Sequence, residues 1–162
     1  MDPDPRRVPH LARGLTWREQ PEGFAFRTAA RTVTAADLSG FVALAGFNGP
    51  MFLDVRRAAD AGYTSQVVPG FLTLVLAEGL VLQTNVLHGT GIAFLGCTVE
   101  VARPVYVGDT IEVVVTVTGS RPTSTGDRGI VSTRNTVYNQ DHEVVLVYTP
   151  QRMQRGEHLD EG

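Results

Sequence analysis

The sequence predicts an α+β fold in which one antiparallel sheet wraps around a single buried helix. Three observations support this prediction. Residues 71–87 form a segment, FLTLVLAEGLVLQTNVL, that is apolar on nearly every side and too long for a strand. After Gly89 the apolar period changes to two, and short turns separate the segments that follow. One buried helix followed by a run of strands is typical of the α+β class.

Turn residues divide the second half of the chain into strands. We expect these strands at residues 92–106, 109–119, 129–138 and 143–153, with turns at 107–108, 121–127 and 140–141. The lone Cys97 falls in an apolar run of the first of these strands. A single cysteine excludes an internal disulfide, and we expect a buried structural thiol.

The first half of the chain predicts a strand and two helix starts. Residues 24–33 alternate in polarity and indicate a strand. Thr34 then has the pattern of an N-cap with Asp37 at N3, a capping box with Asp in place of Glu, and Gly46 can close that helix. Pro69 and Gly70 open the long apolar helix, because proline suits a helix start.

Length and composition indicate one globular domain. The chain has 162 residues, a net charge of −3, and no basic surface that would predict nucleic-acid binding. We expect an extended arm at residues 1–23, the folded domain at 24–153 and a polar tail at 154–162. Neither a signal peptide nor an apolar run of about 18 residues is evident, so we expect a cytoplasmic protein that does not bind membranes.

Four short stretches occur in an order that is characteristic of a known family. They are GFNGPMFLD (46–54), VPGFLT (68–73), RPVYVGDTIEV (103–113) and NQDHEVVLVY (139–148). With the order of the elements, they resemble the MaoC-like (R)-specific enoyl-CoA hydratases and acyl dehydratases over roughly residues 24–153. The resemblance implies a hotdog domain that acts on coenzyme A or acyl-carrier-protein thioesters and needs no cofactor beyond the thioester.

The same resemblance implies a degenerate active site. The family motif is D-x-N-P-x-H-x-D, and counting back from Asp54 places the catalytic His at Phe52 and the catalytic Asp at Phe47. In the family this pair holds and activates a water molecule, which a phenylalanine cannot do because it has no titratable proton. A shift of one residue would align Asn48 with the family's Asn and would still leave no base. Phe47 and Phe52 would instead form apolar pocket walls.

Part of the family's machinery is retained on the long helix. Gly70 matches the glycine whose backbone N–H, at the helix N-terminus, binds the thioester carbonyl oxygen. Glu78 stands where the family has a small polar residue, on a helix that is otherwise apolar. Burying an unpaired charge is costly, so Glu78 is either a relocated general acid or base, with Asn48 as its helper, or the ion-pair partner of an arginine.

Several other residues are candidates for substrate binding. By the resemblance, Tyr63 and Ser65 lie in a polar loop near the pocket mouth, and Thr73 ends the VPGFLT motif. Arg103 is a candidate for a phosphate contact, since guanidinium binds phosphate bidentately. No spacing of His, Cys and Asp supports a metal site.

Three functions remain open from the sequence. The chain is an acyl-thioester hydratase or dehydratase with a non-standard active site, a non-catalytic acyl-thioester-binding subunit, or a hotdog thioesterase. In the first case we expect a homodimer. In the second we expect a heterodimer with a MaoC-like protein that keeps the Asp and the His, because some family members work as unlike pairs.

Overall fold

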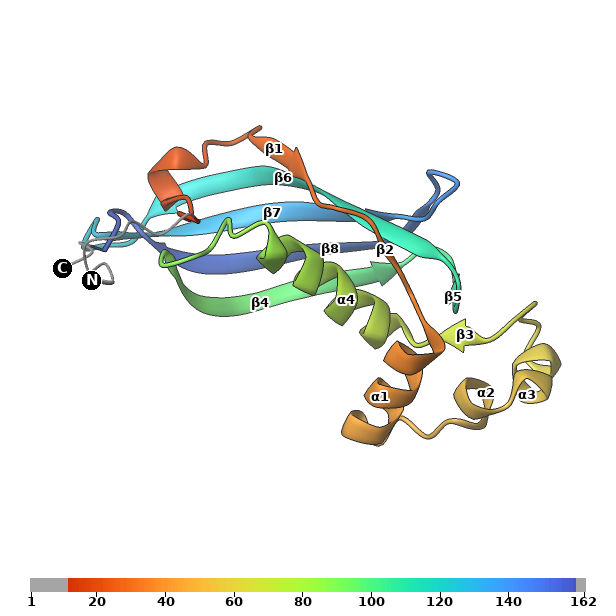
Figure 1. The fold of residues 1–162 in the computed structure, drawn as a ribbon. Helices are drawn as coiled ribbons and strands as arrows, with labels where there is room; N and C mark the ends of the chain where they lie inside the picture. The colour runs from red at the N-terminus through yellow and green to blue at the C-terminus, as the bar shows by residue number, and fades with distance from the viewer. Residues whose placement is uncertain (1–11, 160–162) are drawn as a thin grey trace, which may run out of the picture.

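The computed structural model describes residues 12–159, which form a six-stranded antiparallel sheet with a long helix across one of its faces, and a small two-stranded sheet (Figure 1). The strands are β1 (Ala25–Arg27), β2 (Arg31–Thr32), β3 (Val67–Val68), β4 (Gly91–Val101), β5 (Val105–Tyr106), β6 (Thr110–Pro122), β7 (Arg128–Tyr138) and β8 (Val144–Arg155). The helices are α1 (Ala35–Ala45), α2 (Pro50–Leu53), α3 (Val55–Asp60) and α4 (Gly70–Gln83), after a 3-10 turn, η2 (Trp17–Glu19).

The strand order β1-β6-β7-β8-β4 places α4 against the middle of the sheet and confirms the predicted α+β class. Six α4 side chains are buried in the core: Leu72, Thr73, Leu76, Ala77, Leu80 and Val81. They meet the inward side chains of β6, β7 and β8, which alternate with outward ones along each strand. Each fully buried Leu or Val contributes about 1.5–3 kcal/mol to stability, so this contact is the main source of the fold's stability.

Two expected strands are interrupted. The strand expected at residues 24–33 breaks at Thr28, whose hydroxyl accepts a hydrogen bond from the backbone N–H of Val113 at 3.0 Å. The strand expected at residues 92–106 ends at Val101, because the backbone N–H groups of Ala102 and Arg103 both donate to the carbonyl of Val145 and the regular ladder stops there. The chain continues as β5, which pairs with β3 in a separate two-stranded sheet beside the start of α4.

The predicted cap of α1 is confirmed. The Thr34 hydroxyl accepts from the backbone N–H of Asp37 at 3.2 Å, and the Asp37 carboxylate accepts from the backbone N–H of Thr34 at 2.8 Å. Gly46 closes the helix with φ 65°. The short helices α2 and α3 were not expected, and with α1 they extend beyond one end of the sheet (Figure 1).

The expected boundaries of the folded domain need correction. Residues 12–23, expected in an extended arm, include η2, and Arg18 Nη1 donates to the carbonyl of Gly156 at 2.6 Å. Gln20 and Gln154 are both buried and share a side-chain hydrogen bond. The described parts of both flanks, residues 12–23 and 154–159, therefore contact each other at the edge of the domain, while residues 1–11 and 160–162 lie outside the described residues. Within residues 12–159 no helix is long and apolar enough to cross a membrane.

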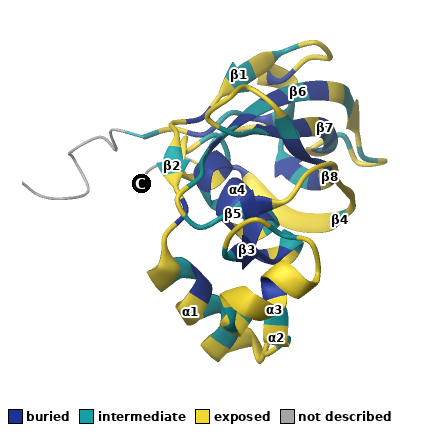
Figure 2. Cartoon of the chain, turned by 90° about the vertical axis from the view of Figure 1, so that its right-hand side faces the viewer, coloured by how far each residue is buried: buried dark blue, intermediate teal, exposed yellow. Residues whose placement is uncertain are grey.

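Strand β4 forms an open edge of the sheet. All of its residues except Gly96 are exposed, including Phe94, Leu95, Val99 and Val101, and Figure 2 shows the strand as largely exposed. The prediction of a buried Cys97 is wrong: β4 is the last strand of the sheet among residues 12–159, and the thiol is exposed.

Candidate functional site

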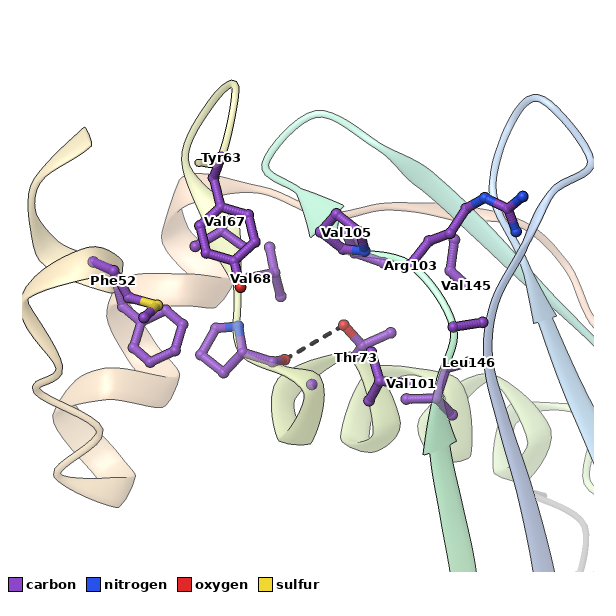
Figure 3. Close-up of a pocket in the computed structure, with 15 residues that line it drawn as sticks. Phe52, Tyr63, Val67, Val68, Thr73, Val101, Arg103, Val105, Val145 and Leu146 are labelled. Atoms are coloured by element: carbon purple, nitrogen blue, oxygen red, sulfur yellow. Dashed lines mark hydrogen bonds between the residues drawn. The ribbon is translucent and has the colours of Figure 1, made fainter. Parts of the chain in front are cut away.

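A cavity of about 290 Å³ lies at the N-terminus of α4 (Figure 3). It is lined by Met51, Phe52, Tyr63, Val67, Val68, Pro69, Gly70, Thr73, Val101, Ala102, Arg103, Pro104, Val105, Val145 and Leu146. Thus the helix start, the small β3–β5 sheet, the end of β4 and the beginning of β8 meet at one place. The cavity brings together five of the residues predicted to bind substrate: Phe52, Tyr63, Gly70, Thr73 and Arg103.

Gly70 presents the free end of a helix to this cavity. The carbonyl of Pro69 accepts from the backbone N–H of Thr73 at 3.1 Å and from its hydroxyl at 3.4 Å (dashed in Figure 3). The N–H groups of the first helical turn, beginning with Gly70, have no intrahelical acceptor. They can donate to a carbonyl oxygen, and the helix dipole favours negative charge there. A Cβ on Gly70 would lie 3.1 Å from Val101 Cγ2, so a larger residue would crowd this end of the cavity.

Phenylalanine rings fill the space on the α1–α2 side of the cavity. The ring of Phe47 lies 5.4 Å from that of Phe41, 5.6 Å from that of Phe52 and 6.1 Å from that of Phe71. Phe52 reaches the cavity wall, whereas Phe47 sits in the middle of this cluster. Aromatic pairs at these separations attract one another, so the cluster holds the two rings in place. Neither ring can exchange a proton.

Of the other predicted site residues, two lie at the rim of the cavity and two lie outside it. Tyr63 lies on the rim, edge-on to Tyr106 with ring centroids 6.5 Å apart. The half-exposed Arg103 side chain donates to the carbonyl of Val144 at 3.1 Å and faces Glu143 at 3.4 Å. Ser65 and Asn48 are exposed and do not line the cavity.

Glu78 is held by a charged partner rather than left alone in an apolar core. Arg152 Nη2 donates to Glu78 Oε1 at 2.6 Å and to Oε2 at 2.7 Å, and the Tyr148 hydroxyl donates to Oε2 at 2.9 Å. Burial raises the pKa of Tyr148, and the neighbouring Glu78 carboxylate raises it further. The nearby Asn135 amide lowers this pKa in part, although its atoms make no hydrogen bond. The structure therefore gives Glu78 the ion-pair geometry that was one of its two expected roles.

Glu78 also lies away from the cavity at Gly70. It lines a separate hollow of about 440 Å³ between α4 and β4, together with Leu74, Val75, Gly79, Leu82, Phe94, Cys97 and Tyr148. Neither of its two partners, Tyr148 and Arg152, was predicted from the sequence. Tyr148 and Arg152 share the inward face of β8 with Leu146, and an arginine on a buried face is the signal that could have predicted an internal counter-charge. Residues 12–159 contain no cluster of His, Cys, Asp or Glu suited to a metal ion.

The chain is similar to known hydratases and dehydratases. Residues 21–147 match the family described as FAS1-like, dehydratase domain region. Over 106 residues the chain is 32% identical to the (R)-specific enoyl-CoA hydratase of Aeromonas caviae, covering 65% of this chain and 75% of that protein.

Solved structures agree with this similarity. A MaoC-like dehydratase from Rhodospirillum rubrum superposes with a TM-score of 0.82 at 26% identity, covering 90% of this chain and 100% of the other. A Mycobacterium tuberculosis protein with a double hotdog fold superposes with a TM-score of 0.78 at 19% identity. The match covers 89% of this chain and 45% of that one, so this fold corresponds to one hotdog unit.

Proposed function

Because the chain belongs to the FAS1-like dehydratase-region family of MaoC-like hotdog proteins, we propose that it is the non-catalytic, acyl-thioester-binding subunit of a hydratase or dehydratase. Its own residues bind the thioester at the N-terminus of α4. A second hotdog chain, which keeps the Asp and the His, supplies the general acid and base. Substrate and partner therefore meet at a shared site.

One observation carries this proposal. The rings of Phe47 and Phe52 occupy the positions that the motif aligns with the family's Asp and His, and they are packed 5.6 Å apart in an aromatic cluster. The neighbouring cavity retains Gly70 and the free N–H groups of α4. A site that keeps its oxyanion donors and replaces its proton-transfer groups with hydrocarbon favours binding over acid–base catalysis.

The open edge of β4 supports the existence of a partner chain. Its unpaired N–H and C=O groups run along an 11-residue strand that also exposes Phe94, Val99 and Val101. Natural sheets cover or interrupt such an edge, because it otherwise recruits other chains. Val101 also touches the space beside Gly70, so a strand that covers β4 would lie next to the thioester cavity.

Purified protein tests the proposal directly. We expect no loss of enoyl absorbance with crotonyl-CoA or longer enoyl-CoA thioesters. The same ligands at one hundred times Kd should stabilise the fold by about 2.7 kcal/mol and raise Tm by about 5–10 °C. In Gly70→Ala the new Cβ would press on Val101, and we expect the affinity to fall at least tenfold. Gly40→Ala in α1 is the matched control, because its Cβ would meet nothing within 4 Å.

A second experiment tests whether an Asp and a His placed at positions 47 and 52 are enough to give hydration. Phe47→Asp with Phe52→His should give measurable hydration of crotonyl-CoA. Phe47→Asn with Phe52→Gln should remain silent, although it disturbs the aromatic cluster to a similar extent. Hydration by the unmodified chain would contradict the proposal, and so would a failure of every thioester to bind.

A self-sufficient hydratase is the second candidate, and Glu78 favours it. Its carboxylate and the Tyr148 hydroxyl border an apolar hollow, where a proton-transfer group would be effective. The ion pair with Arg152 and the separation from Gly70 weigh against this function. Glu78→Gln decides between the two: if the unmodified chain turns over enoyl-CoA and the variant does not, Glu78 carries the chemistry.

A further inference from the structure

The Glu78–Arg152 pair has unused hydrogen-bonding capacity at a buried position. The Arg152 side chain is only 7% exposed, and within the described residues its guanidinium uses Nη2 alone, on Glu78. The guanidinium also lines a hollow, so its remaining N–H groups can donate to a group that enters there. A ligand that covers this hollow removes water from the guanidinium, so a ligand with a hydrogen-bond acceptor at this position would bind more favourably than one without.

Two hollows meet at this pair. Glu78 lines the 440 Å³ hollow that also contains Cys97. It lines a second hollow of about 360 Å³ as well, and Arg152 forms part of the wall of that one. Leu82 and Phe94 line both, and nearly all the remaining wall is apolar. The space is therefore shaped for a hydrocarbon chain, with one polar position where Arg152 and Glu78 meet.

The distance from Gly70 matches a medium-length acyl chain. Gly70 and Glu78 lie eight residues apart on α4, and a helix rises 1.5 Å per residue, which gives about 12 Å. An extended chain advances about 1.2 Å per bond, so a chain that starts at Gly70 needs about eight to ten bonds to reach the pair. Strands β4 and β8 run beside α4 over this distance, from Val101 and Leu146 to Phe94 and Arg152.

The charge of the pair decides which group fits. Glu78 and Arg152 neutralise one another, so a carboxylate on the ligand would face the Glu78 carboxylate as well as the guanidinium. A plain hydrocarbon would leave the free N–H groups desolvated without an acceptor. An uncharged oxygen satisfies these N–H groups without adding charge, and a hydroxyl can in addition donate to the carboxylate.

We propose that the Glu78–Arg152 pair is a specificity-determining site that receives a hydroxyl or keto oxygen, carried about eight to ten bonds from the thioester carbonyl of the bound acyl chain. This inference rests on the proposed thioester binding at Gly70 and names its substrate class: acyl thioesters oxygenated toward the far end of a medium-length chain. Glu78 holds the guanidinium in position, and Arg152 makes the contact.

Isothermal titration of the full chain tests the site with defined ligands. We expect 10-hydroxydecanoyl-CoA to bind about tenfold more tightly than decanoyl-CoA, and the thioester of decanedioic acid to gain nothing over decanoyl-CoA. The variant carrying Glu78→Leu and Arg152→Leu replaces the whole pair with hydrocarbon, so no buried charge is left behind. In this variant the preference for the hydroxyl should vanish, and its thermal unfolding confirms that it folds.

Hexanoyl-CoA separates the two proposals, because its chain is too short to reach Glu78. It should bind the unmodified chain and the double variant equally. If hexanoyl-CoA binds but the hydroxyl gives no advantage, or the double variant retains that advantage, the specificity site is refuted and the thioester site stands. If hexanoyl-CoA does not bind the unmodified chain, both proposals fall.

Discussion

Replacing Glu78 and Arg152 singly and together should show how the fold tolerates a charge pair beneath its central helix. In Glu78→Leu a guanidinium that is 7% exposed loses its ion-pair partner, and we expect a loss of about 3 kcal/mol in the free energy of unfolding. In Arg152→Leu the carboxylate is 25% exposed and keeps the Tyr148 hydroxyl, so we expect a smaller loss, about 2 kcal/mol.

The double variant should lose much less than the sum of the single variants. Leucine at both positions removes both charges, and the remaining cost is the Tyr148 hydroxyl left without its acceptor, about 1–2 kcal/mol. The expected coupling energy is therefore about 3–4 kcal/mol, which urea unfolding monitored by circular dichroism resolves. Additive losses, or a greater loss in Arg152→Leu than in Glu78→Leu, would refute the assignment of a buried pair with unequal exposure.

Three further predictions concern stability. Burial raises the pKa of Tyr148 above its ordinary value of 10.0, so the unfolded chain releases this proton first as the pH rises. The contribution of Tyr148 to the free energy of unfolding is therefore fully present below pH 10 and decreases as the pH rises above it. Relative to Tyr148→Phe, the unmodified chain should lose up to about 1.4 kcal/mol of this free energy per pH unit. Hydrogen bonds from Thr34 lower the pKa of Asp37, so its contribution is present at neutral pH and is lost as the pH falls below the ordinary value of 3.8; the stability difference from Asp37→Asn should shrink between pH 5 and pH 3. Leu80→Ala should cost about 2–5 kcal/mol in urea unfolding, because its side chain is buried between α4 and the sheet.

Local signals of the sequence predicted much of the fold. Thr34 and Asp37 form the expected capping box because that motif is satisfied within one helical turn, whatever lies around it. The period of two located β6, β7 and β8, since an inward and an outward face force alternation. The separate pairing of β3 with β5 could not be predicted, because two-residue strands carry no period and depend on tertiary contact.

The site was predicted less completely, for a physical reason. The start of α4 at Gly70 could be placed because proline suits a helix start, whereas binding of a carbonyl oxygen by its backbone N–H stays a prediction. Glu78 could not be decided from the sequence, because its role depends on Arg152, which lies 74 residues away along the chain and reaches it only through the packing of β8 against α4. Cys97 was placed in the core because alternation cannot distinguish an interior strand from an edge strand.

In the two proposals, the rings of Phe47 and Phe52 and the Glu78–Arg152 pair act at different positions along the bound substrate. Near the proposed thioester site, the packed rings of Phe47 and Phe52 cannot transfer protons, so in this proposal that end holds the substrate and a partner supplies the chemistry. Two turns further along α4, the charged pair borders the apolar hollow, where we propose that it selects the acyl chain at a place too distant to reach the reacting carbons. A subunit that has no general acid or base of its own can contain a buried charged pair, because the pair would not shift the pKa of a nearby catalytic group. The two proposals are therefore compatible in one chain, and together they predict a subunit that selects the acyl group.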